Sequence, residues 1–146
     1  LDWTVDELKD MDRKTRKLMT MNNGLHPRAD VDRLYLPRRE GGKGMMSIEE
    51  IVRLEECSLS DYVKNILPEE NVLGDFLKEK GKKELKSEQR AERKEKWKEK
   101  ALHGQYPKKV EEAETCSWRW LETGWMKRET EGLLMAAQDQ ALHTRN

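Results

Sequence analysis

The apolar residues of this chain are few, and most of them favour helices. Of the 51 apolar residues among 146, Leu, Met and Ala supply 31, whereas Val and Ile supply nine. Because β-branched residues favour strands, this imbalance favours helix over strand. Charged residues make up 40% of the chain and hydrophobic residues 35%; an average domain has about 25% and about 45–50%. The sequence therefore predicts an all-α fold of small helical bundles with narrow apolar stripes.

Two capping boxes mark where the first long helices begin. A Thr-x-x-Glu box at 4–7 and a Ser-x-x-Glu box at 47–50 each precede apolar residues at three- and four-residue spacing. Such boxes satisfy the free amides of a helix N-terminus. Asn23-Gly24 and Pro68 are typical of the residues that follow helix ends. We therefore expect one helix from residue 5 to the Asn-Gly pair and another from residue 48 to the proline.

The formal net charge is zero, but the charge is segregated along the chain. Residues 9–43 carry +5, residues 44–77 carry −6 and residues 78–100 carry +5, while both ends are slightly acidic. Two basic blocks thus flank an acidic one. Asymmetry of this kind concerns the partners of a protein, or pairing within it, rather than its fold.

Composition divides the chain into three segments. Residues 1–68 form a helical segment with a basic loop, residues 69–105 a charged connector, and residues 106–146 a Trp-rich helical segment. Within the connector, residues 78–100 are almost wholly charged, which fits either a long solvated helix or a disordered linker. In the last segment, Trp118, Trp120 and Trp125 indicate a small core or a stacking and docking surface.

An irregular Arg- and Gly-rich loop separates the two predicted long helices. Arginine forks and glycine-exposed amides suit phosphate oxygens, and Tyr35 among them suits stacking on a base or sugar. The alternative is a solvated loop whose arginines pair with the acidic helix at 49–61. The candidate nucleic-acid-binding residues, including those at the end of the first helix, are Arg13, Lys14, Arg16, Lys17, Arg28, Arg33, Arg38, Arg39 and Lys43.

Signatures of catalysis and of cofactor binding are missing. The sequence has no P-loop, dinucleotide-binding, zinc-protease or serine-hydrolase motif, and its three His and two Cys are scattered. We therefore predict no catalytic residues, no metal, no cofactor and no small-molecule substrate, with Cys57 a packing residue. We expect no membrane span, because no apolar run approaches the length that a span needs. The two widely spaced cysteines predict an intracellular location, cytoplasmic or nuclear. The first residues suggest the middle of a longer polypeptide.

Several stretches resemble one family of mobile-element proteins. They are residues 11–20, residues 25–38, Pro37-Arg38-Arg39-Glu40-Gly41-Gly42-Lys43-Gly44 before a Ser-led helix, residues 118–121 and residues 127–142. Together they resemble the region that follows the polymerase palm in non-LTR retrotransposon reverse transcriptases. The Pro-Arg-x-x-Gly-Gly-x-Gly element is the most specific part of the resemblance.

The resemblance implies a thumb and linker that hold template–primer or element RNA. The partners it implies are RNA or an RNA–DNA duplex, together with other domains of a parent polyprotein. The family's catalytic aspartates have no counterpart in this sequence, so the resemblance does not imply polymerase activity here. The competing interpretation is a helical protein-interaction module or a domesticated remnant of a retroelement.

Overall fold

The computed structural model describes residues 3–66, 81–110 and 117–142. These residues form seven α-helices and one 3-10 turn and no strand, which confirms the all-α prediction. The helices are α1 (Val5–Met21), α2 (Val31–Tyr35), α3 (Ile48–Ile66), α4 (Lys82–Glu99), α5 (Gln105–Lys109), α7 (Arg119–Thr123) and α8 (Arg128–Gln138), and the 3-10 turn η1 spans Arg38–Glu40.

Both predicted capping boxes lie at helix starts. The Thr4 hydroxyl accepts from the backbone amide of Glu7, whose carboxylate accepts from the Thr4 amide at 2.9 Å. At the start of α3, Ser47 Oγ accepts from the Glu50 amide at 3.5 Å. The helix α1 ends at Met21 with Asn22 as its C-cap, and the following Asn23 adopts a positive φ of 54°. The predicted starts of both helices and the predicted end of α1 are confirmed.

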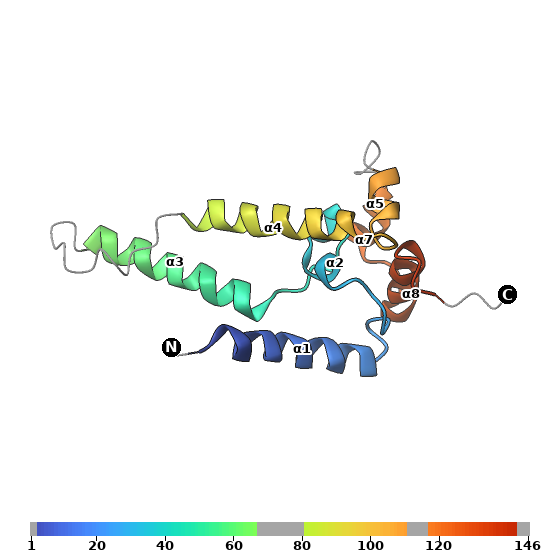
Figure 1. Ribbon diagram of the computed structural model, residues 1–146, viewed down its shortest axis with the longest axis horizontal. Helices are drawn as coiled ribbons and strands as arrows, with labels where there is room; N and C mark the ends of the chain where they lie inside the picture. Colours follow the sequence, from blue (N-terminus) through green and yellow to red (C-terminus); the bar gives the residue numbers. More distant parts are fainter. Residues whose placement is uncertain (1–2, 67–80, 111–116, 143–146) are drawn as a thin grey trace.

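The long helices lie side by side and the short ones gather at one end. In Figure 1, α3 and α4 run antiparallel, with α1 along the other side of α3 and α2 between the long helices. The helices α5, α7 and α8 cluster beyond the C-terminal end of α4. The helix α4 spans residues 82–99 of the charged block. The alternative of a disordered linker is therefore wrong for this part of the block.

The core draws on all three segments into which the sequence divides the chain. Its buried members come from the region around α2, from α4 and from the C-terminal helices: Leu25, Leu34, Leu36, Trp97, Trp118, Leu121 and Met135. The rings of Trp97 and Trp118 lie 6.0 Å apart. The segment boundary near 105 therefore does not separate two cores, and the one near 68 lies outside the described residues.

The tryptophans divide between core and surface. Trp97 and Trp118 are fully buried, Trp120 packs at the edge of the core, and Trp125 is exposed. Gly41 lies against Trp118, and a Cβ at this glycine would come within 2.7 Å of the indole ring. This close approach, together with a φ of 87°, explains the glycine in the Gly-Gly-Lys-Gly stretch.

Two further predictions meet different outcomes. The region predicted to be an irregular loop contains α2 and η1, so that prediction is wrong in part. Asp30 caps α2 by accepting from the Arg33 amide at 3.0 Å. Cys57 is a buried free cysteine on α3, as a packing residue would be. The short helix that the sequence suggests around 72–77 lies outside the described residues.

Candidate nucleic-acid interface

The structure separates the nine predicted basic residues into three groups. One group is tied to acidic residues of α8 and the segment just after it, one lies on α1, and one consists of single exposed side chains. The first group is Arg33, Arg38 and Lys43; the second is Arg13, Lys14, Arg16 and Lys17; the third is Arg28 and Arg39.

Arg33 is a core residue, and its prediction as a phosphate contact is wrong. Its side chain is 0% exposed and forms a 2.8 Å ion pair with Asp139, which is equally buried. Its Nε donates to the Gly41 carbonyl at 2.8 Å, and its guanidinium lies 5.0 Å from the Trp97 ring and 5.4 Å from the Trp118 ring. Its hydrogen bonds and its charge pair are therefore made inside the protein.

Burial dominates the ionisation of this pair. It lowers the pKa of the Arg33 guanidinium and raises the pKa of the Asp139 carboxyl, while the mutual attraction of the two charges opposes both shifts. Asp139 also accepts from the Asp30 amide at 3.3 Å. A buried pair with this many hydrogen bonds costs several kcal/mol to break by removing one partner.

Arg38 and Lys43 converge on one carboxylate of α8. The Arg38 guanidinium donates to both oxygens of Glu131, one of them at 3.1 Å, and its Nε donates to the Leu121 carbonyl at 2.6 Å. The Lys43 ammonium binds the same carboxylate, and both groups are nearly buried. Lys43 is therefore wrong as a free phosphate contact, and Arg38, whose side chain is 31% exposed, is paired with Glu131 rather than free. The alternative of pairing with the helix at 49–61 is also wrong for them, because their partner lies on α8.

Glu131 remains ionised in this setting. Burial alone would raise its pKa, but the hydrogen bonds from Arg38 and Lys43 outweigh burial and lower the pKa. Bidentate arginine–carboxylate pairs of this kind combine charge with directional hydrogen bonds. The basic loop is thus anchored to α8.

The α1 group points outward and remains available. The side chains of Arg13 and Lys14 are 71% and 74% exposed and share Asp10 as a partner, at 3.2 and 2.9 Å. Lys17 is exposed as well. Exposed pairs of this kind contribute little to stability, so a phosphate can replace the carboxylate at small cost.

A groove beside α1 brings basic residues from two distant helices together. It encloses about 280 Å³ and is lined by Lys9, Arg13 and Arg16 of α1, by Tyr35 at the end of α2, and by Arg93 of α4. Arg16 Nη1 donates to the Tyr35 hydroxyl at 2.6 Å. The guanidinium carbons of Arg16 and Arg93 lie 5.8 and 4.4 Å from the Tyr35 ring centroid.

The acidic residues of the groove already have partners. Asp12 accepts from Ser47 Oγ at 2.7 Å and from the Ile48 amide at 2.9 Å, so its charge stabilises the N-terminus of α3. Glu49 pairs with Arg53 at 2.7 Å. The lining therefore carries four basic side chains and two acidic ones that are held elsewhere.

Arg93 is the residue that sequence reasoning missed. It sits in the second basic block, where interspersed glutamates suggest a solvated helix, and it pairs with Glu50 and, at 3.5 Å, with Asp32. One signal points to it: Arg93 precedes Trp97 by four residues and therefore shares a helix face with it. Since Trp97 is buried, that face of α4 points toward the rest of the protein.

Another member of the second basic block closes the far end of α2. The Lys100 ammonium binds Asp30 and Asp32 at 2.6 Å each, and His103 Nδ1 lies 2.8 Å from Asp30. Burial would raise the pKa of Asp30, but Lys100, the Arg33 amide and His103 together lower it. Lys100 is therefore structural and holds α2 against α4.

The described residues contain no cluster of three or more His, Cys, Asp or Glu side chains arranged to hold a metal ion. No helix in the described part of the chain has the length and apolarity that a membrane crossing requires. Comparison with protein-family models, with curated proteins and with solved structures finds no match. A functional assignment therefore depends on the geometry of the groove.

Proposed function

We propose that this chain is a non-catalytic, nucleic-acid-contacting helical module that holds RNA or an RNA–DNA duplex through the groove beside α1. This is the role that the resemblance to non-LTR retrotransposon reverse transcriptases implies for a thumb and linker. The proposal changes the residues that make the contact. Lys9, Arg13 and Arg16 replace Arg33, Arg38 and Lys43, and Arg93 holds Tyr35 from the other side while paired with Glu50 and Asp32.

One observation carries the proposal: two arginines from different helices flank a single tyrosine at the groove. Arg16 has a neutral hydroxyl as its partner, so its charge is not cancelled by a carboxylate there. Guanidinium groups bind phosphates bidentately, and an aromatic ring among them can contact a base or a sugar. Phosphate contacts of this type confer affinity without sequence preference.

Binding of a fluorescent oligonucleotide at several salt concentrations tests this proposal. We expect the double variant Lys9→Ala/Arg13→Ala to bind more weakly than the wild type for all sequences. The slope of log K against log salt concentration should be smaller in magnitude by about 1.4 to 1.8, because two phosphate contacts are lost. These two side chains are exposed, so the substitutions leave the core intact.

Lys108→Ala/Lys109→Ala is the matched control. It removes the same charge from α5, away from the groove. Equal affinity and equal salt dependence in the wild type and both variants would contradict the proposal. An equal loss in both variants would also contradict it, since binding would then follow net charge.

A second candidate function rests on the exposed apolar residues of α3. Leu59, Tyr62 and Ile66 are all more than half exposed, and their spacing places them along one face of the helix. Such a face suits docking of another domain of a parent polyprotein. If the chain is a domesticated remnant, the face suits docking of a separate protein. Concentration-dependent association without nucleic-acid binding, abolished by Leu59→Ser, would favour this function over the first.

A further inference from the structure

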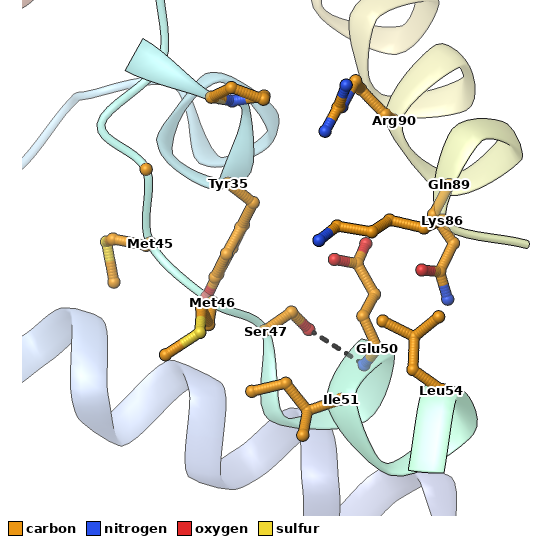
Figure 2. Close-up of a pocket in the computed structure, with 12 residues that line it drawn as sticks. Tyr35, Met45, Met46, Ser47, Glu50, Ile51, Leu54, Lys86, Gln89 and Arg90 are labelled. Carbon is orange, nitrogen blue, oxygen red and sulfur yellow. Dashed lines mark hydrogen bonds between the residues drawn. The ribbon is translucent and has the colours of Figure 1, made fainter. Parts of the chain in front are cut away.

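A pocket adjoins the basic groove on the other side of Tyr35. It encloses about 260 Å³ between α3, α4 and the segment that leads from α2 to α3. Figure 2 shows Lys86 reaching from α4 toward Tyr35, with Arg90 on the same helix above it and Ile51 and Leu54 on α3 below. Drug-sized ligands occupy pockets of about 300–1,000 Å³, so this pocket suits a single planar ring system.

Apolar side chains form much of the pocket wall. Met45, Met46, Ile51 and Leu54 line it together with Tyr35. Met46 is 76% exposed, although a side chain of this kind favours burial. Methionines adapt their shape and make favourable contacts with aromatic rings. A flat ring inserted here would cover apolar surface that the protein leaves open to solvent.

One polar group in the wall has no partner among the described residues. Gln89 Nε2 is buried and makes no hydrogen bond there, and a buried donor without an acceptor destabilises a folded protein. The amide of a glutamine offers a donor and an acceptor side by side, the pattern that matches the edge of adenine. The pocket thus combines apolar walls with an unused amide.

The pocket and the groove have lining residues in common, and basic side chains line both. Tyr35 and Ser47 line both. At the pocket, Lys86 forms no ion pair with any other described residue, and Arg90 pairs at 3.4 Å with Glu40. A phosphate chain can therefore run along basic side chains from the groove to the rim of the pocket.

We propose that this pocket receives one unpaired base of a single-stranded nucleic acid whose phosphates lie in the groove. The inference rests on the proposed function and narrows its ligand from nucleic acid in general to a single-stranded segment. A base within a duplex is stacked and paired, so it is not free to enter. Tyr35 lines both parts, with cations at each and methionines at the pocket.

Two oligonucleotides of ten nucleotides test the inference by fluorescence anisotropy. One is oligoadenylate, and the other has the same length and phosphates but carries abasic sugars throughout. We expect the wild type to bind oligoadenylate roughly tenfold more tightly, the gain that one well-stacked base confers. Equal affinity for both would overturn the pocket inference while leaving the groove proposal standing.

Two variants locate the effect. Gln89→Leu removes the amide while keeping a strong helix former, and Leu54→Trp fills the pocket. In both variants the ratio of the affinity for oligoadenylate to the affinity for the abasic oligonucleotide should fall toward one. The affinity for the abasic oligonucleotide should not change. Unchanged preference in folded Gln89→Leu would overturn the inference even if Leu54→Trp does not fold. Failure of the wild type to bind either oligonucleotide or an RNA–DNA duplex of the same length would instead overturn the proposed function, whereas binding of the duplex alone would overturn only the pocket inference.

Discussion

Arg33 and Arg16 are both arginines beside aromatic rings, but they have opposite roles. Arg33 lies against both Trp97 and Trp118 and pairs with a buried carboxylate. Arg16 contacts Tyr35 and has a neutral hydroxyl as its partner. The nature of the partner separates the two roles, since a buried carboxylate cancels the charge and a hydroxyl does not.

The same contrast holds for the two regions as a whole. The Arg- and Gly-rich loop is fastened to the C-terminal region by Glu131 and Asp139, whereas the basic side chains of α1 face the groove or the solvent. Loss of a basic residue should therefore reduce stability in the loop and reduce binding at the groove. Substitutions in each region separate the two effects.

The largest effect should come from Arg33→Ala. This variant leaves the buried carboxylate of Asp139 without its cation, and we expect the free energy of unfolding to fall by about 3–5 kcal/mol. Urea unfolding monitored by circular dichroism measures the change. The exposed Arg28→Ala should stay within about 0.5 kcal/mol of the wild type. Similar stabilities for the two variants would place Arg33 outside the core.

The adjacent residues Arg38 and Arg39 should differ less in their effect on stability. Arg38→Ala removes hydrogen bonds to Glu131 and to the Leu121 carbonyl, so unfolding should become easier by about 1–3 kcal/mol. Arg39 is exposed and lies 3.6 Å from Glu40, and Arg39→Ala should change the stability by less than about 0.5 kcal/mol. The same urea experiment compares them, and a reversed order would contradict the assignment of the loop to α8.

The smallest effect distinguishes the regions by their response to salt. The hydrogen bond and charge of Lys14 lower the pKa of the exposed Asp10 carboxyl, and Arg38 and Lys43 lower that of the buried Glu131 against the effect of burial. Carboxyl-carbon NMR titrations at low and high salt should show the Asp10 pKa rising toward its ordinary value while that of Glu131 changes less. An equal rise at both would contradict the burial of the Glu131 network.

The lowered pKa of Glu131 also sets the sign of its contribution to acid stability. A carboxyl whose pKa is lower in the folded state stabilises the fold above its ordinary pKa and loses that contribution as the pH falls through the lowered value. The loop anchor should therefore weaken in acid below about pH 4.5. Asp139, whose pKa burial raises, contributes with the opposite sign.

Local signals in the sequence predict much of the fold. The capping boxes at 4–7 and 47–50 and the Asn-Gly pair are short-range patterns, and the structure places helix boundaries there. The scarcity of β-branched residues predicts the all-α class for the same reason, because it acts residue by residue.

The division of the arginines could not be predicted from the same signals. Arg33 and Asp139 are 106 residues apart, and Arg16 and Arg93 come from different charge blocks. A charged residue has nearly the same helix propensity whether it faces solvent or a buried partner, so local pattern does not distinguish them. Trp97 within the charged block is the one local sign that a face of α4 points inward.

NMR spectra of the arginine Nε–Hε groups test the central claim most directly, because they observe both regions in one titration. On addition of the ten-nucleotide oligoadenylate, we predict that the signals of Arg13 and Arg16 shift with concentration. Those of Arg33 and Arg38, held by carboxylates and carbonyls, should stay in place. Shifts at Arg33 and Arg38 with none at the groove would contradict the account.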